Sequence, residues 1–208
     1  MTASASAPSL PGAEPAGSSA VHWLRIGQDH YAAGRNDEAV AAFQLGLAAA
    51  EAQPAASTPI ETVADLHFKL GNACMVGGNL ELATAHYRAA LRLVPTLTPC
   101  WCNLGNVLVQ TGKPQEAIAY FIEALKLNPR HWATRTNLVQ ALTATRQYII
   151  AKALLQELLG EQPGNAVLHH QHGKVHYELE QQSLGDDVLL GRGQRLYEVG
   201  SRRPMARV

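Results

Sequence analysis

Apolar residues recur along most of the chain at three- and four-residue spacing, which is the periodicity of one face of an α-helix. Gly, Pro and Asn interrupt this pattern after about every 12 to 15 positions. No stretch alternates apolar and polar residues as a half-buried strand does. Helices this short are marginally stable alone because their first turn is costly to form. The pattern therefore predicts an all-α protein whose helices pack in pairs.

The predicted helices carry an internal repeat. The same residue types recur 34 positions apart, and we call each such set of positions a column. The columns are Leu70-Gly71, Leu104-Gly105 and Leu138-Val139; Ala83, Ala117 and Ala151; Tyr87, Phe121 and Leu155; Ala90, Ala124 and Leu158; and Pro95, Pro129 and Pro163. Five columns in one register indicate tandem structural units.

One copy of the repeat matches a known pattern closely. The pattern is W-x2-L-G-x2-Y, then A-x3-F, then P, and the matching residues are Trp101, Leu104, Gly105, Ala117, Phe121 and Pro129. The chain resembles the tetratricopeptide repeat proteins, in which each 34-residue unit is a helix-turn-helix; only Leu108 departs, standing where the pattern has tyrosine. The resemblance implies an α-solenoid of antiparallel helix pairs, the tetratricopeptide superhelix.

We expect four repeats plus a degenerate fifth repeat or capping helix. The expected repeats span about 20–53, 64–97, 98–131 and 132–165, with a partial copy at 166–180, so that the solenoid covers 20–180. The first copy places Trp23 and Gly27 in the pattern. About ten extra residues before the second copy lengthen either its preceding helix or the loop.

The two ends of the chain do not follow the repeat. Residues 1–19 are rich in Ala, Ser, Pro and Gly and have little to bury, which predicts a disordered arm. For residues 181–208 we expect a capping helix interrupted at Gly191 and Gly193, followed by a frayed tail.

Small and large residues alternate within a repeat in an order that packing explains. Gly112 ends the first helix of the third copy, and Pro114 begins the second, where a missing N–H costs nothing. Gly105 and Ala117 carry almost no side chain, so the two helices can approach closely while Phe121 fills the space beside them.

Charge and hydropathy exclude several kinds of partner. Lys plus Arg and Asp plus Glu each number 17, so the net charge of +0 offers no long-range attraction to nucleic acid or to anionic membranes. No run reaches the roughly 18 to 20 consecutive apolar residues that span a bilayer. We therefore expect no nucleic acid and no membrane partner.

Two further features predict a cytoplasmic location. The N-terminal residues lack the basic start and apolar core of a secretory signal. The three cysteines, Cys74, Cys100 and Cys102, are too few and too irregularly placed for a disulfide framework.

The resemblance implies that a peptide or partner helix binds along the concave face formed by the first helix of each repeat. The residue after the glycine column is an amide in four copies, namely Gln28, Asn72, Asn106 and Gln140, and is Lys174 in the fifth. An amide both donates and accepts hydrogen bonds, so this row could hold the backbone of an extended peptide. The alternative is that these are ordinary polar residues on a solvated face.

Other positions of the same face complete the predicted groove. Asn103 and Asn137 resemble the asparagine ladder in the tetratricopeptide arm of O-linked N-acetylglucosamine transferases. Phe68 and Met75 could take apolar side chains of a ligand, or could pack against neighbouring helices instead. Val109 is a further candidate position of this face. Phe68 and Cys102 stand where the chaperone-adaptor subgroup needs lysine, so we expect no carboxylate clamp of that type.

Histidines near the C-terminus form the other candidate site. His169, His172 and His176 share one helix face, with His170 nearby, a spacing that could ligate zinc or nickel. The alternative is a capping helix whose packing face has become polar.

No motif places a nucleophile beside a base, so we expect no enzyme activity, no cofactor and no bound metal. The sequence predicts a noncatalytic adaptor or assembly scaffold that binds a protein or peptide partner. Two alternatives stay open: the substrate-recruiting arm of a larger enzyme such as a glycosyltransferase, and a metal-handling protein that uses the histidine face.

Overall fold

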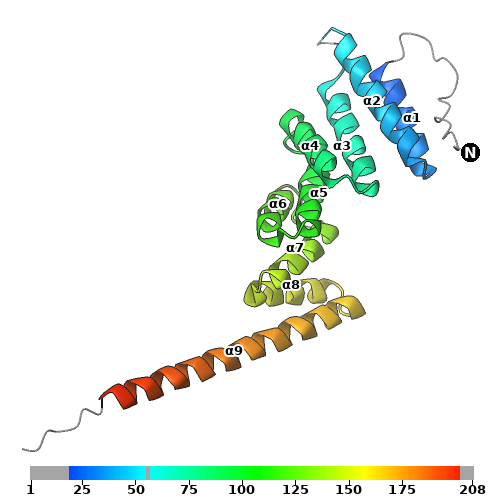
Figure 1. Ribbon diagram of the computed structural model, residues 1–208. Coiled ribbons are helices and arrows are strands. Elements are labelled where there is room, and N and C mark those ends of the chain that lie inside the picture. The colour runs from blue at the N-terminus through cyan, green and yellow to red at the C-terminus, as the bar shows by residue number, and fades with distance from the viewer. Residues whose placement is uncertain (1–18, 55–56, 202–208) are drawn as a thin grey trace, which may run out of the picture. The chain divides into compact units, whose positions relative to one another are not determined.

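The computed structural model describes the backbone of residues 19–54 and 57–201, and the side chains in those ranges up to Leu184 (Figure 1). Apart from Ser19, the expected disordered arm lies outside the described residues. The described part is helical and contains no strand, which confirms the all-α prediction. Its helices are α1 (Ala20–Ala32), α2 (Asn36–Ala52), α3 (Ile60–Val76), α4 (Leu80–Leu93), α5 (Thr98–Gln110), α6 (Pro114–Leu127), α7 (Trp132–Ala144), α8 (Tyr148–Glu161) and α9 (Ala166–Ser201).

The helices pack in consecutive pairs inside two compact units, Met1–Thr134 and Arg135–Val208. In the first unit α1 packs on α2, α3 on α4 and α5 on α6, and contacts of α2 with α3 and of α4 with α5 join successive pairs. In the second unit α8 packs on α9. Each pair is a helix-turn-helix, the arrangement that the 34-residue spacing predicts.

A left-handed residue closes the turn between the two helices of each of the first four repeats. Gly34, Gly78 and Gly112 have φ angles of 75°, 77° and 75°, a conformation that glycine adopts without a steric penalty. Gly112 follows the end of α5 and Pro114 begins α6, as predicted. The fourth repeat uses Arg146 at the same place, with φ of 59°.

A ring covers the column glycine in each of the first three pairs. A Cβ atom added to Gly27, Gly71 or Gly105 would collide with the aromatic ring of the paired helix, which belongs to Phe43, Tyr87 or Phe121 respectively. The fourth copy has Val139 and Leu155 instead, and both are buried. Compared with the first three copies, the fourth thus has a larger residue in its first helix and a smaller one in its second.

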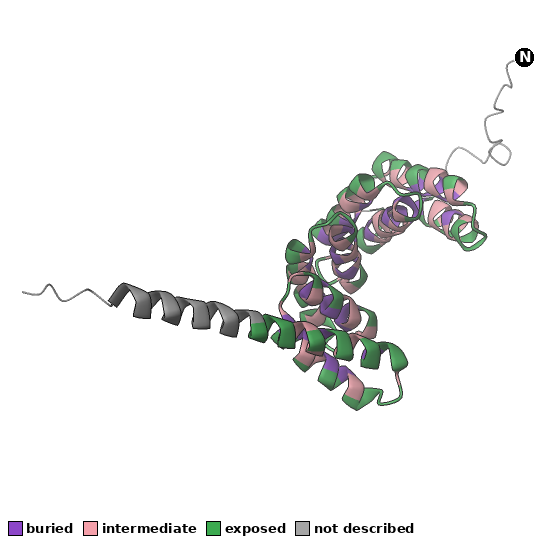
Figure 2. Ribbon diagram, turned by 60° about the horizontal axis from the view of Figure 1, so that its bottom comes forward, coloured by how far each residue is buried: buried purple, intermediate pink, exposed green. Residues whose placement is uncertain are grey.

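Apart from the exposed prolines, the column residues are buried, and Figure 2 shows the buried positions of the helices in purple. Phe43, Leu70, Tyr87 and Leu104 belong to one apolar cluster in the first unit. Cys74, Cys100 and Cys102 are buried and unbridged. Burial raises the pKa of the Cys100 thiol to about 12, so this group stays protonated and packs as a small apolar side chain.

The ten-residue insertion is shared between two helices and a loop. Both α2 and α3 have 17 residues, whereas α4 has 14 and α5 has 13. The second repeat therefore begins with Ile60 rather than Ala64. The sequence predicted a longer preceding helix or loop but missed the extra first turn of α3.

The C-terminal helix corrects another prediction. α9 runs for 36 residues, from Ala166 to Ser201, and passes Glu180, Gly191 and Gly193 without a break. The expected interruption at the two glycines was wrong, because a glycine inside a helix costs only about 1 kcal/mol and this segment contains no proline. Leu168 and Val175 on the described part of α9 are buried.

Candidate functional site

The position of the family's tryptophan makes the same contact in two repeats. Trp101 donates its indole N–H to the carbonyl oxygen of Pro95 over 2.9 Å. In the fifth repeat, Nε2 of His169 lies 2.7 Å from the carbonyl oxygen of Pro163. Since a carbonyl only accepts, His169 must hold its proton on Nε2. The His169 imidazole therefore donates the same hydrogen bond as the Trp101 indole does at the equivalent position.

Two other histidines of the C-terminal face, His172 and His176, make contacts along α9. The rings of His172 and His176 meet edge to face with centroids 6.4 Å apart, and Nδ1 of His176 lies 3.2 Å from Glu180. Burial, together with the nearby charge of Lys152, lowers the pKa of His172. Within the described ranges, no three His, Cys, Asp or Glu side chains come together as a metal-binding group. The arrangement matches a capping helix with a polar face.

Two members of the predicted peptide groove instead join consecutive repeats. The hydroxyl of Tyr87 donates to Oδ1 of Asn72 over 2.8 Å, and Nδ2 of Asn103 donates to the same oxygen over 2.8 Å. Asn103 also lies 3.3 Å from the Tyr87 hydroxyl. Burial raises the pKa of Tyr87, so its hydroxyl remains a donor. Tyr87 itself was missed as a polar group, although it stands in a column where Phe43 and Phe121 have no hydroxyl.

Phe68 and Met75 lie around the same tyrosine. The Phe68 ring is tilted against Tyr87 with centroids 6.2 Å apart, and Sδ of Met75 lies 3.8 Å from the Tyr87 hydroxyl. Both are partly buried and pack against the apolar cluster. These contacts are those of the alternative in which the two side chains support the fold.

The remaining predicted groove residues differ in exposure. Gln28, Asn106, Val109 and Asn137 are half-buried, whereas Gln140 is exposed. Their role as groove residues stays a prediction.

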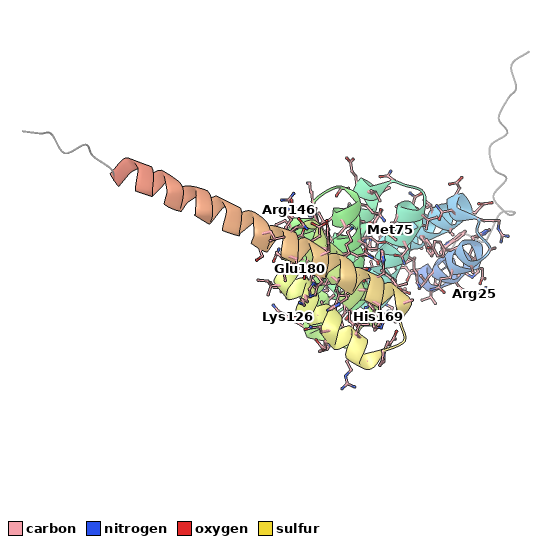
Figure 3. The ribbon with its side chains drawn as sticks, turned by 90° about the horizontal axis from the view of Figure 1, so that it is seen from below. Arg25, Met75, Lys126, Arg146, His169 and Glu180 are labelled. Carbon is pink, nitrogen blue, oxygen red and sulfur yellow. The ribbon has the colours of Figure 1, made fainter. Side chains whose placement is uncertain are left out.

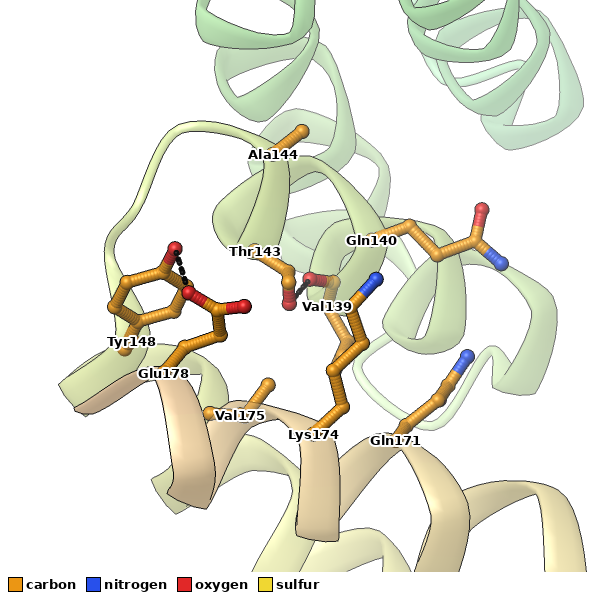
Figure 4. Close-up of a pocket in the computed structure, with 9 residues that line it drawn as sticks. All are labelled: Val139, Gln140, Thr143, Ala144, Tyr148, Gln171, Lys174, Val175 and Glu178. Carbon is orange, nitrogen blue, oxygen red and sulfur yellow. Dashed lines mark hydrogen bonds between the residues drawn. The ribbon is translucent and has the colours of Figure 1, made fainter. Parts of the chain in front are cut away.

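A pocket of about 380 Å³ lies between α7, α8 and α9 of the second unit (Figure 4). Ligand sites in proteins commonly enclose about 300 to 1,000 Å³. We call it the α9 pocket; it is lined by Val139, Gln140, Thr143, Ala144, Tyr148, Gln171, Lys174, Val175 and Glu178. Of the predicted site residues only Gln140 lies here. Gln171, Lys174 and Glu178 come from α9. Lys174 continues the column of the predicted amide row, whereas Gln171 and Glu178 were not predicted as site residues because the repeat pattern fades along α9.

Charged and neutral polar groups stand at different places around the α9 pocket. Tyr148 donates to Oε2 of Glu178 over 3.4 Å on one side, while Lys174 extends from α9 toward α7 (Figure 4). Oε1 of Gln171 is buried and accepts no hydrogen bond from any described residue. Thr143 donates to the carbonyl oxygen of Val139 in its own helix. The pocket thus combines a cation and a carboxylate with apolar walls.

Comparison with family models decides the family. Two models, both described as tetratricopeptide repeat, match residues 24–97 and 99–131. The chain is a tetratricopeptide repeat protein. No curated protein sequence matches it.

Solved structures support the same α-solenoid fold at low sequence identity. A tetratricopeptide repeat protein from Parabacteroides merdae is 15% identical with a TM-score of 0.62, over 79% of this chain; this chain spans 60% of that one. YrrB, a tetratricopeptide repeat protein with an unusual peptide-binding site, is 19% identical with a TM-score of 0.66 over 77% of this chain and 78% of its own. The first tetratricopeptide domain of Spaghetti (RPAP3), bound to the HSP90 peptide SRMEEVD, is 19% identical with a TM-score of 0.54 over 61% of this chain and 94% of its own.

No helix in the described part of this tetratricopeptide repeat protein is long and apolar enough to cross a membrane. Arg25, Lys126 and Arg146, which are labelled among the side chains in Figure 3, are exposed.

Proposed function

We propose that this protein is a noncatalytic interaction module that binds an extended peptide segment of a partner protein, with the α9 pocket as the selective part of the site. The observation that carries the proposal is the lining of that pocket, which sets the amide side chains of Gln140 and Gln171 and the ammonium group of Lys174 beside apolar walls. An amide both donates and accepts hydrogen bonds, so these side chains suit the N–H and carbonyl groups of a peptide backbone.

The other lining groups describe the side chains that the segment would carry. Val139, Ala144 and Val175 form walls suited to one aliphatic side chain. The exposed ammonium group of Lys174 favours an acidic residue near it, while Glu178 interacts with the Tyr148 hydroxyl. We therefore expect an acidic residue close to a leucine-like residue in the bound segment. Two structural neighbours whose names mention a peptide-binding site or a bound peptide make this ligand class reasonable.

The predicted amide row contributes less uniformly than its sequence suggests. Gln140 lines the α9 pocket, and Gln28 and Asn106 stay predicted contacts for the peptide backbone. Asn72 and Asn103 already bind each other and Tyr87. Replacing Asn72 by alanine would leave a buried tyrosine hydroxyl without its acceptor, so loss of binding in that variant could reflect loss of stability.

The test uses an array of short peptides that contain an acidic residue two positions before a leucine, with binding measured by fluorescence anisotropy. Lys174→Ala and Gln171→Leu should each lower the affinity for the tightest-binding peptide about tenfold or more, because each removes one buried or charge-assisted hydrogen bond to the peptide. Lys113→Ala, which changes an exposed lysine outside the pocket, is the matched control and should bind like wild type.

A second arm identifies the ligand group that meets Lys174. Replacing the acidic residue of the peptide by its amide should weaken binding to wild type but should not weaken it further in Lys174→Ala. Equal affinity of all three variants, or no binding of any peptide by wild type, would exclude the α9 pocket as the selective site.

The proposed cellular role follows from a site that binds a partner and catalyses no reaction. A module that holds a partner segment serves as an adaptor or assembly scaffold, and the same surface would serve a recruiting arm. The cytoplasmic location stays a prediction from the sequence.

A further inference from the structure

The face of α9 that points away from its packing partner α8 carries an exposed stripe. Leu168 and Val175 are buried, and the residues half a helical turn away from them are all exposed. Of these, Tyr177 is 59% exposed and Leu184 is 58% exposed. We call this set the α9 stripe; it consists of Ala166, His170, Gly173, Tyr177, Glu180 and Leu184.

Gly173 in the middle of the stripe lacks the contact that the same column makes elsewhere. Gly27, Gly71 and Gly105 are each covered by an aromatic ring from the following helix. A Cβ atom built on Gly173 meets no described atom within 4 Å. Among the described elements no helix follows α9 that could return to cover it. Gly173 is therefore an uncovered position with room for an aromatic ring, whereas the column glycines of the first three repeats are each covered by one.

The α9 stripe is complementary to itself when two copies run antiparallel. Around a two-fold axis at position 175, Gly173 of one copy faces Tyr177 of the other, since each lies two residues from the axis. His170 and Glu180 face each other in the same way at five residues, and so do Ala166 and Leu184 at nine. Each pairing combines a small residue with a large one, or a histidine with a carboxylate.

From these pairings we infer that the chain forms a homodimer in which the α9 stripes of two copies pack antiparallel, with each Tyr177 ring seated on the partner's Gly173. The ring would make the contact that Phe121 makes with Gly105 inside one chain. Each His170 would interact with the partner's Glu180, whose oxygens also face the His176 ring of their own chain. Because the axis generates every contact twice, both tyrosines and both carboxylates are used.

Sedimentation equilibrium on the full chain tests the inference. Wild type should form a dimer with twice the 22.4 kDa mass of one chain, with a dissociation constant of about 100 µM or below. Gly173→Gln should sediment as a monomer, because the glutamine side chain occupies the space that the partner's Tyr177 ring needs. The matched control is Gly160→Gln on α8, where an added Cβ also meets no described atom within 4 Å, and this variant should stay dimeric. Circular dichroism should show equal helicity in both, since each change removes a glycine from a helix.

A residue swap tests the register. Gly173→Tyr sets two rings against each other and Tyr177→Gly leaves two glycines facing, so each should weaken the dimer about hundredfold through two symmetric contacts. The double variant G173Y/Y177G restores ring against glycine and should recover most of that loss. A monomeric wild type, an unchanged dimer in Gly173→Gln, or no recovery in the double variant would overturn the inference; the first result would leave the stripe to a helix of another protein.

Discussion

At the scale of single residues, one column of this protein shows how different chemistries fill one packing position. The first-helix position that holds tryptophan in the family pattern is Trp23, His67, Trp101, Arg135 and His169 in successive repeats. Trp101 and His169 both reach a proline carbonyl. Arg135 is buried to 4% side-chain exposure and pairs with Glu157 at 2.9 Å and Glu161 at 2.8 Å. In these three repeats the position holds a bulky group whose polar end finds a partner, and the group need not be tryptophan.

His67 makes the same column sensitive to pH. Its ring stacks on His86, with the two Nδ1 atoms 3.1 Å apart, which requires one of them to be an unprotonated acceptor. Burial lowers the pKa of both imidazoles, and for His67 the charges of His86 and Arg92 lower it further. The unfolded chain, with an ordinary histidine pKa, binds more protons than the folded chain. Stability from this pair is therefore present at neutral pH and is lost as the pH falls below about 6.5.

We expect the free energy of unfolding to fall between about pH 7 and pH 5, and part of this fall to disappear in His67→Trp/His86→Tyr. That variant copies the equivalent pair of the next repeat, Trp101 and Tyr120, whose rings lie 5.9 Å apart and contain no imidazole. Urea unfolding at a series of pH values measures the difference. Parallel pH profiles for the variant and wild type would show that the histidine pair has no such effect.

At the scale of helices and turns, local geometry follows the repeat more strictly than residue identity does. Three turns place glycine in the left-handed region, and the fourth places Arg146 there with φ of 59°. Left-handed backbone costs a non-glycine residue about 1 to 2 kcal/mol. The packing of the two helices therefore holds Arg146 in the left-handed conformation despite this cost.

Arg146→Gly should therefore stabilise the protein by about 0.5 to 1 kcal/mol, since relief of the left-handed strain exceeds the extra entropy of glycine in the unfolded chain. A higher urea midpoint with an unchanged slope is the expected measurement. The reciprocal change Gly112→Arg, at φ of 75°, should lower the midpoint by a similar amount. A lower midpoint for Arg146→Gly would mean that the arginine side chain contributes more than its backbone costs.

The helix crossing supplies a second prediction at this scale. Gly105→Val should cost about 1 to 3 kcal/mol because the added carbons collide with the Phe121 ring. Phe121→Leu makes room, as Leu155 does beside Val139 in the fourth repeat. We expect the double variant to cost less than the sum of the single changes by about 1 kcal/mol or more, measured by urea unfolding of all four proteins.

Gly160→Val separates crowding from helix propensity, because a Cβ there meets no described atom within 4 Å. Its cost should stay below about 1 kcal/mol. Simple additivity of Gly105→Val and Phe121→Leu would contradict the exchange of size between the two helices.

At the scale of the whole molecule, repetition creates surfaces that no single repeat contains. The α9 pocket needs side chains from α7, α8 and α9, and the α9 stripe is exposed because no described helix covers it. The adaptor and recruiting-arm hypotheses both use a binding surface of this kind, and they differ only in what else the full-length protein contains. The proposed peptide binding and the inferred self-association involve different faces of α9, so one experiment can fail without deciding the other.

The sequence by itself determined the helical class, the 34-residue unit, its turns and its family, because each of these depends on residues close together in the chain or repeated at a constant spacing. It also identified Gly105 and Ala117 as the positions of closest approach, both of which are buried. Tertiary structure decided which polar residues are available for a ligand. Asn72 and Gln140 occupy the same column, yet Asn72 is bound by Tyr87 and Asn103 whereas Gln140 lines a pocket. The hydrogen-bond partners of a side chain come from neighbouring helices far away in sequence, and a repeat pattern does not encode them.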